Sequence, residues 1–390
     1  MTIGLIGHYL GARMGIGSFI DRLLPPLLIE LDRRGIDAKV ITSPNALSQT
    51  PAIQDLQQRS PEKVRVLPQL DYSPIKRFAW VATQFSKYCR QLGLDQILWL
   101  SNPMVLPWHP PSLVVLHDVN EWKAKEKYGS RIKTTLRSWM YIEASIAWAK
   151  KIISISEATT SDIFHFRPKL RSRQKVRTIP NGLDSPLSSL TPAKIDPPAA
   201  PFLLSVGRID PEGKKLPEAI ALTQALRNLS DTPWEIHLMG GTNKSTREAG
   251  NTFLREIESL PWAHYHGFTE DAELAAWYRE ATATVFLSQN EGFGSPVAEA
   301  ASFGKRVIVN AKNQATLSAG GNAVIPITPS TTAQESKGAA TQVLEQLSSQ
   351  ASENHHSASA STIARVLPKT YTYADAAIAY AEEISKLVNA

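Results

Sequence analysis

Hydrophobic and polar positions follow two alternating patterns along this chain. Short runs rich in Ile, Val and Leu predict buried strands, and they are separated by longer segments whose apolar residues recur with helical period, such as 75–92 and 132–149. Strands that alternate with helices in this way are typical of a doubly wound α/β fold with a parallel sheet. The strands expected in the first half are Ile3–Gly7, Ala38–Thr42, Val64–Leu67, Ile97–Leu100, Leu113–His117 and Ile152–Ile155.

The pattern is interrupted once, at a segment rich in Pro, Ser and Ala, SPLSSLTPAKIDPPAAP. It has no periodicity and predicts an interdomain linker over residues 186–201. Afterwards the alternation resumes, with strands expected at Phe202–Val206, Glu235–Met239, Thr284–Ser288 and Val307–Val309. We therefore expect two Rossmann-like domains, 1–185 and 202–370, facing across a cleft, with ligands at the carboxyl ends of the strands.

Composition narrows the class of protein. A chain of 390 residues is long enough for two such domains. The single cysteine, Cys89, excludes an internal disulfide and makes a cysteine-based metal site improbable. No apolar stretch approaches the roughly 18 residues of a membrane span, and the N-terminus does not resemble a signal peptide, so we expect a cytoplasmic protein. The formal net charge of +6 is equally consistent with anionic ligands and with scattered surface charge.

Two strand ends in the first half carry candidate residues. Gly15 and Gly17 follow the first strand and precede a helix, where glycines let the backbone approach a ligand. A nicotinamide dinucleotide site would need a third glycine and an acidic residue at the end of the second strand. That strand ends in Thr42 and Ser43, which disfavours a nicotinamide enzyme. His117 follows a strand and could contact a sugar or phosphate, although a structural cap is an equal alternative. The helix expected over 18–34 contains Pro25 and Pro26, which predict a kink or restart.

The second half carries cations beside a helix start. Arg208 follows the strand Phe202–Val206, and Lys214 and Lys215 come just before the next helix. An arginine fork and a lysine point charge near a helix N-terminus suit a diphosphate. The alternative is a set of solvated loop charges, and the sequence does not decide which lysine would bind.

The most specific segment is SQNEGFGSPVAEA, which begins at residue 288. A strand ends, a glycine-rich loop turns, and a helix follows with Ser295 expected as its N-cap. Backbone N–H groups of such a loop can bind phosphate, and Glu291 and Glu299 can accept hydrogen bonds from the vicinal hydroxyls of a sugar. Complementing the helix dipole would explain Glu299 alone, but neither the glycines nor Glu291.

Taken in order, these segments resemble the family 4 retaining glycosyltransferases of the GT-B fold, also called group 1. The matching segments are GHYLGARMGIGSF, VVLHDV, ISISEATTSDI, RTIPNGLD, LLSVGRIDPEGKKL and EGFGSPVAEA. The C-terminal helix, within 371–390, resembles the family helix that crosses back to the N-terminal domain. The sequence departs from the family in lacking a proline after Gly304, and in having LSAGG where a further glutamate is common.

The resemblance implies transfer of a sugar from a nucleotide-diphosphate sugar, such as a UDP- or GDP-sugar, to a hydroxyl of a glycan or lipid-linked acceptor. The anomeric configuration would be retained and no cofactor or metal required. The implied catalytic residues are His117, Arg208, Lys214 and Glu291. The implied donor-binding residues are Gly15, Gly17, Arg208, Lys214, Lys215, Glu291, Gly292, Phe293, Gly294, Ser295 and Glu299.

The same sequence features are compatible with other functions. A catalytically silent sugar-nucleotide or glycan-binding protein would share the fold, as would a phosphorylase or a nucleotide-sugar epimerase. A nucleic-acid-binding role would rest on charge alone, so no nucleic-acid partner is expected. The basic run 167–177 and the helix near Lys76 could touch the inner face of an anionic membrane, or could be a solvated basic surface.

Overall fold

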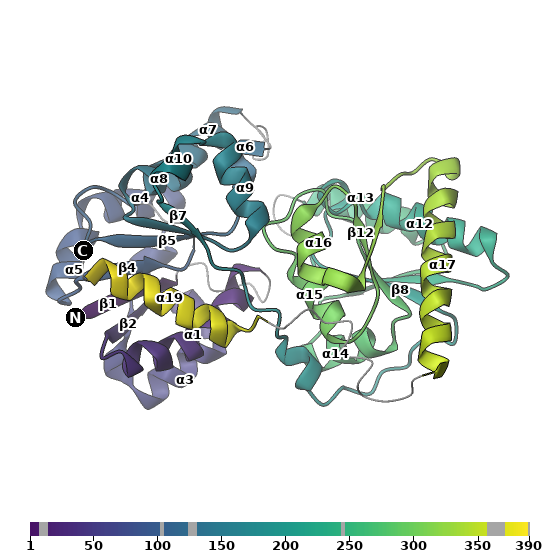
Figure 1. Ribbon diagram of the computed structural model, residues 1–390, viewed down its shortest axis with the longest axis horizontal. Helices are drawn as coiled ribbons and strands as arrows, with labels where there is room; N and C mark the ends of the chain where they lie inside the picture. The colour runs from purple at the N-terminus through teal and green to yellow at the C-terminus, as the bar shows by residue number, and fades with distance from the viewer. Residues whose placement is uncertain (8–14, 102–104, 124–130, 243–245, 357–370, 389–390) are drawn as a thin grey trace. The chain divides into compact units, whose positions relative to one another are not determined.

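A computed structural model describes the chain except for residues 8–14, 102–104, 124–130, 243–245, 357–370 and 389–390. It divides into two compact units, one formed by Met1–Gly182 with Tyr371–Ala390, and the other by Leu183–Thr370. Figure 1 shows helices packed around a central sheet in each unit. Among the described residues, no helix combines the length and apolar character needed to cross a bilayer.

The first unit contains, within its described residues, a seven-stranded sheet in the order β3-β2-β1-β4-β5-β6-β7, with parallel pairing throughout. This is a doubly wound arrangement, because the strand order reverses beside β1. The strands are β1 (Thr2–Gly7), β2 (Asp37–Thr42), β3 (Val64–Val66), β4 (Gln96–Trp99), β5 (Ser112–Leu116), β6 (Lys151–Ser154) and β7 (Val176–Thr178). The helices are α1 (Ile16–Arg33), α2 (Pro44–Gln49), α3 (Pro51–Arg59), α4 (Pro74–Thr83), α5 (Phe85–Gln91), α6 (Asn120–Lys123), α7 (Arg131–Ser138), α8 (Ala144–Trp148), α9 (Glu157–Phe166), α10 (Lys169–Ser172) and α19 (Tyr373–Val388).

Helix α1 continues through Pro25 and Pro26, so of the predicted kink or restart the restart does not occur. Each interior proline costs about 3 kcal/mol. Against this, Leu23, Leu24, Leu27 and Leu31 are all buried, and each contributes about 1.5–3 kcal/mol. The buried face of α1 therefore outweighs the local penalty. The C-terminal helix α19 packs beside α1, as Figure 1 shows.

The second unit repeats the design with a six-stranded parallel sheet over its described residues, in the order β10-β9-β8-β11-β12-β13. The strands are β8 (Phe202–Val206), β9 (Glu235–Met239), β10 (Ala263–Gly267), β11 (Ala283–Phe286), β12 (Val307–Asn310) and β13 (Val324–Ile327). The helices are α11 (Pro211–Lys214), α12 (Leu216–Leu229), α13 (Arg247–Ile257), α14 (Asp271–Glu280), α15 (Ser295–Ser302), α16 (Gln314–Gly320) and α17 (Ala333–His356). The predicted α/β class with two Rossmann-like sheets is thus confirmed.

The proline-rich segment 186–201 belongs to the second unit. A short 3₁₀ turn at Pro186–Ser189 is held by α14, because the Arg279 guanidinium donates to the Ser188 and Leu190 carbonyls at 3.0 and 2.9 Å. The Ala193 N–H also donates to the Ala272 carbonyl at 3.0 Å. Apart from this turn the segment has irregular backbone, and these contacts hold it against α14.

Candidate active site

Glycines that directly follow β8 and β9 let the two backbones lie in close contact where the strands end. The Gly207 N–H donates to the Met239 carbonyl at 2.8 Å, and the Gly240 N–H donates to the Gly267 carbonyl at 2.7 Å. Gly240 has φ 134°, and a Cβ there would lie 2.7 Å from the Gly207 carbonyl carbon and closer still to its oxygen. No side chain fits at this point, so Gly240 is required for β8 to deliver Arg208 where it does.

Arg208 lies directly after this glycine and is oriented by Asp210. Its Nη2 donates to Asp210 Oδ2 at 3.1 Å, while Asp210 Oδ1 caps α11 by accepting from the Gly213 N–H at 3.1 Å. Among the described residues, the buried Arg208 Nε has no hydrogen-bond partner. A buried donor without a partner is unfavourable unless a ligand supplies an acceptor, which makes Arg208 a candidate anion contact. Arg208 also lines a small pocket with Gly207, Lys214 and Phe286.

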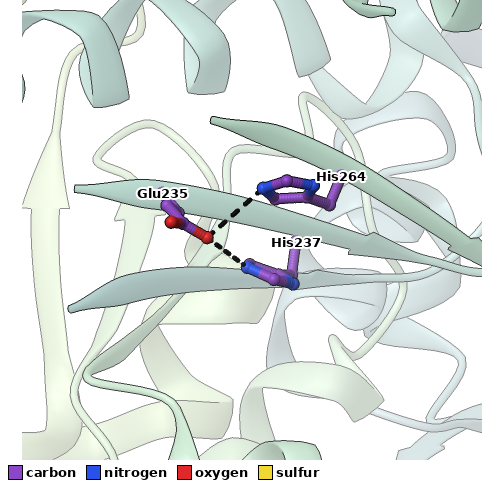
Figure 2. A group of neighbouring side chains, drawn as sticks. All are labelled: Glu235, His237 and His264. Carbon is purple, nitrogen blue, oxygen red and sulfur yellow. Dashed lines mark hydrogen bonds and ion pairs between the residues drawn. The ribbon is translucent and has the colours of Figure 1, made fainter. Parts of the chain in front are cut away.

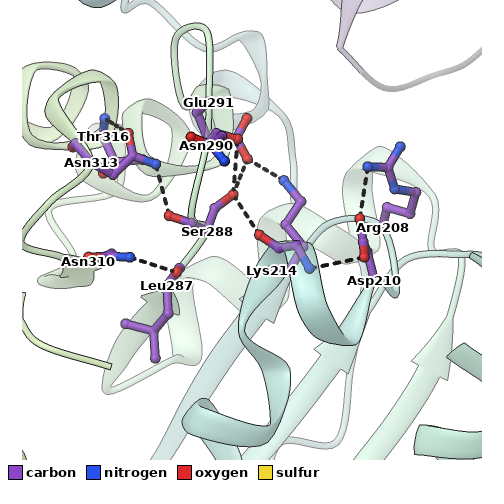
Figure 3. A network of polar contacts seen from close by, with 11 residues as sticks. Arg208, Asp210, Lys214, Leu287, Ser288, Asn290, Glu291, Asn310, Asn313 and Thr316 are labelled. Atoms are coloured by element: carbon purple, nitrogen blue, oxygen red, sulfur yellow. Dashed lines mark hydrogen bonds and ion pairs between the residues drawn. The ribbon is translucent and has the colours of Figure 1, made fainter. Parts of the chain in front are cut away.

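Lys214 and Glu291 form an ion pair that joins the C-terminal end of α11 to the loop after β11 (Figure 3). The Lys214 ammonium lies 4.7 Å from the centroid of the Phe286 ring, a cation–π contact. Ser288 Oγ donates to Glu291 Oε1 at 2.5 Å, so the carboxylate has two partners on its own unit. The backbone strengthens the junction, because the Gln289 N–H donates to the Gly213 carbonyl at 3.1 Å.

The two adjacent lysines differ in backbone conformation and in partner. Lys215 has φ 55° and ψ 45°, the left-handed region, at the turn between α11 and α12. Its ammonium pairs with Glu218 at 3.2 Å, one turn along α12. Only Lys214 is brought to Glu291, an assignment that spacing alone could not make.

The glycine-rich loop leads into α15, but its cap differs from the one expected. The helix begins at Ser295, and the preceding Gly294 adopts φ 95° and ψ 47° with no side-chain cap. The prediction of Ser295 as the N-cap was therefore wrong by one residue. Glycine takes the left-handed conformation without strain, so the turn forms at Gly294 and Ser295 becomes the first helical residue. The Phe293 side chain is buried, which leaves the backbone of the loop for ligand contacts.

Glu299 lies within α15, and its side chain is nearly buried, with 9% of the residue exposed. The Tyr278 hydroxyl of α14 donates to Glu299 Oε2 at 3.5 Å. Glu291, by contrast, lies in the loop after β11. The two carboxylates therefore sit at different depths of the same loop-and-helix element.

Two asparagines that the sequence analysis missed support this loop. Asn313 Nδ2 donates to the Ser288 carbonyl at 2.9 Å, and its Oδ1 accepts from the Thr316 N–H at 3.4 Å (Figure 3). Asn310 Nδ2 donates to the Leu287 carbonyl at 3.5 Å. The signal was present in the sequence, since Asn310 is the last residue of β12 and Asn313 follows the strand, at the edge where parallel strands end.

In the first unit, His117 follows β5 and is buried. Its Nε2 donates to the Leu100 carbonyl at 2.9 Å, and its ring contacts the Phe19 ring edge-on at 4.8 Å between centroids. Burial lowers the pKa of His117, so the imidazole is neutral at pH 7. Gly15, with φ 67°, precedes α1, and Gly17 is buried in its first turn. The remainder of the predicted N-terminal loop, 8–14, lies outside the described residues.

Comparisons with known proteins agree with this geometry. The model for glycosyl transferases group 1 matches residues 192–356, and the model for glycosyltransferase family 4 matches residues 27–185. Among curated protein sequences, none matches this chain.

Three solved structures with a similar fold illustrate the structural likeness. A sucrose-phosphate synthase from Thermosynechococcus elongatus has a TM-score of 0.64 at 18% identity, over 100% of this chain and 98% of that one. HepE from Anabaena, in complex with UDP and glucose, has a TM-score of 0.61 at 15% identity, over 100% and 99%. WaaG, a glycosyltransferase involved in lipopolysaccharide biosynthesis, has a TM-score of 0.60 at 14% identity, over 98% and 95%. These likenesses identify the fold as GT-B. The two family models, which between them match most of the chain, show that it belongs to the family 4, group 1 glycosyltransferases.

Proposed function

We propose that this glycosyltransferase moves a sugar from a nucleotide-diphosphate sugar to a hydroxyl of a glycan or lipid-linked acceptor, with retention of configuration and without a metal ion. The observation that carries the proposal is the meeting of Arg208, Lys214 and Glu291 at the carboxyl ends of β8 and β11. A diphosphate ester carries two negative charges at neutral pH. Arg208 and Lys214 supply two positive charges, and the N-terminus of α15 adds a favourable dipole.

Each residue has a role in this proposal. Arg208 directs its buried Nε at the diphosphate, and Lys214 moves from Glu291 to a phosphate oxygen when the donor binds. Glu291, still held by Ser288, then accepts hydrogen bonds from the sugar hydroxyls. Glu299 accepts from the ribose, and the backbone of Gly292–Gly294 approaches the phosphates.

In the transfer step, the bond between the anomeric carbon and the β-phosphate oxygen breaks, and its electron pair stays with the phosphate. The acceptor oxygen forms the new bond on the same face of the sugar, and its proton passes to the departing phosphate oxygen. No protein nucleophile takes part, so the protein lowers the barrier by positioning and by stabilising the charge of the leaving group. The anomeric configuration of the product, read by NMR, tests retention.

UDP is the first nucleotide to test, because HepE, which shares the fold, is seen with UDP and glucose. A thermal-shift panel of nucleoside diphosphates and their sugars, run in EDTA, tests the proposal. A ligand at a hundred times its Kd adds about 2.7 kcal/mol to the free energy of unfolding, which corresponds to several degrees. We expect one diphosphate and its sugar to give this shift. No shift with any member of the panel contradicts the proposal, and a shift without turnover supports the silent binding protein instead.

We also propose peripheral contact with an anionic membrane, consistent with a lipid-linked acceptor in glycoconjugate or polysaccharide assembly. The supporting observation is an exposed apolar row on α7 and on the π-helical segment Trp139–Glu143 that continues it. Within this row, Ile132, Leu136 and Trp139 are 80%, 56% and 58% exposed. The basic run 167–177 is less available than its sequence suggests. Arg167 pairs with Glu143, Arg177 pairs with Glu383, and Lys175 donates to backbone carbonyls of α8.

The Leu136→Glu variant is expected to lower co-sedimentation with anionic vesicles at low salt by about tenfold or more, because it removes apolar burial and adds repulsion. Ile29→Glu is the matched control, since Ile29 is 57% exposed on α1 and lies outside the apolar row. Equal loss in both variants, or no binding by the natural protein, rejects the membrane proposal.

A further inference from the structure

A second polar cluster lies at the opposite ends of the strands from the proposed donor site. Glu235 and His237 stand two residues apart on β9, so both side chains project from the same face. His264 of β10 is the direct register partner of His237, and therefore lies beside it on that face. Figure 2 shows the three side chains converging. Glu235 is the first residue of β9, roughly 13 Å along the strand from its carboxyl end.

The distances within this cluster suit a small metal ion. Glu235 Oε2 lies 3.1 Å from His237 Nε2 and 3.3 Å from His264 Nε2. Zinc bound at about 2.0–2.2 Å by tetrahedral ligands separates its ligand atoms by about 3.3 Å. All three ligand atoms lie within 4.8 Å of one another, and this is the metal-compatible group among the described residues. We propose that Glu235, His237 and His264 bind a divalent transition metal ion, zinc in the first instance.

The surroundings of His237 supply the support that metal-binding histidines commonly have. Its Nδ1 lies 2.8 Å from His266 Nε2, so the ring has a fixed partner on the side away from Glu235. When Nε2 binds the metal, Nδ1 carries the proton and donates to His266, which sets the tautomer and orients the ring. Trp277 and Phe202 pack on the His237 ring at 4.9 and 4.8 Å between centroids, and shield one side of the site from water.

The exposure of the ligands indicates how the metal enters. The His237 side chain is 6% exposed and Glu235 is 23% exposed, whereas His264 is 40% exposed on an edge strand of the sheet. His237 and Glu235 are thus the more enclosed ligands. His264 closes the site from the solvent side, where water would complete a fourth position.

The N₂O ligand set favours zinc, cobalt or nickel over magnesium or calcium, which prefer oxygen ligands. A metal ion at this site would link β10 to β9 and would therefore stabilise this edge of the sheet. The proposed metal site takes no part in the proposed sugar transfer, so whether donor binding needs a metal is a separate question. For this reason, the melting-temperature shifts of the nucleotide panel are compared only among EDTA-treated samples.

The test uses tag-free, EDTA-dialysed protein titrated with zinc by calorimetry, with the visible absorption of bound cobalt as a second readout. We expect one zinc ion per chain, and more than a hundredfold weaker binding in Glu235→Gln and in His264→Gln. The control is the double variant His355→Ala, His356→Ala, which removes the adjacent histidine pair of the sequence and should bind zinc as the natural protein does.

Thermal unfolding shows whether a variant loses zinc binding because it lacks a ligand or because it is misfolded. Without metal, the two test variants should melt close to the natural protein, because glutamine preserves polar contacts at partly exposed positions. Zinc should raise the melting temperature of the natural protein and not of these variants. The proposal is overturned by absent binding in the natural protein, by unchanged binding in Glu235→Gln and His264→Gln, or by loss of binding in the control.

Discussion

Replacing Lys214 by methionine is expected to lower kcat/KM for sugar transfer by about a hundredfold to a thousandfold. Removing one preorganised group that stabilises developing charge has a cost of this size in other enzymes. Lys214 is the ammonium that the structure brings to Glu291 and Phe286, where the proposed phosphate lies. Methionine keeps the length and apolar character of the side chain, so the loss isolates the charge. The measurement is the initial rate of nucleoside diphosphate release with acceptor present.

The matched control for this prediction is Lys215→Met. It removes the same charge from the neighbouring position, whose ammonium pairs with Glu218 on α12. We expect it to change kcat/KM by less than about tenfold, since the Lys215 charge is paired with Glu218 and is screened by solvent. If Lys215→Met loses as much activity as Lys214→Met, the effect is one of local charge density, and the assignment of Lys214 to the phosphate is wrong.

Gly240→Ala is expected to lower the free energy of unfolding of the second unit by about 4 kcal/mol. The new methyl group would overlap the Gly207 carbonyl, which is main chain and cannot rotate away, and overpacking typically costs 1–3 kcal/mol or more. Alanine is also strained at the observed φ of 134°, which adds about 1–3 kcal/mol. Urea unfolding followed by circular dichroism measures the change.

Gly241→Ala provides a control one residue away. A Cβ at Gly241 would meet nothing within 4 Å, and this glycine is not among those with positive φ. Its expected change is within about 0.5 kcal/mol. Equal stability of the two variants would show that β8 and β9 do not need the close exit that positions Arg208.

The sequence predicted which residues lie near the strand ends, because that position depends only on the nearby sequence. Strands such as β8 and β11 are recognised by their runs of apolar residues. A charged residue or glycine that follows such a strand lies at the carboxyl edge of a parallel sheet. Arg208 and Glu291 became candidates because they lie in the segments after these strands. The α/β class and the positions of most strands followed from the same periodicity.

Features that depend on a single backbone torsion could not be predicted. The choice between Lys214 and Lys215 follows from the left-handed conformation of Lys215, which turns the two side chains apart. The displaced cap at Ser295 follows in the same way from Gly294. Neither conformation leaves a pattern of hydrophobic positions that periodicity could detect.

The cluster around His237 was missed for a different reason. Strand β10, with the sequence AHYHG, is a polar edge strand and lacks the apolar run that marks a buried one. Glu235 and His264 are 29 residues apart in sequence, and only the register between β9 and β10 brings them together. Pairing between strands is a tertiary property that local pattern does not encode.

The most direct test of the proposed donor site is a crystal structure of the protein with the nucleoside diphosphate that stabilises it. We expect the diphosphate at the carboxyl ends of β8 and β11, with one phosphate oxygen within hydrogen-bond distance of Arg208 and another within hydrogen-bond distance of Lys214. We also expect the ribose hydroxyls at Glu299, and an open pair between Lys214 and Glu291. A diphosphate bound away from Arg208 and Lys214, with that pair intact, would show that the donor site is elsewhere.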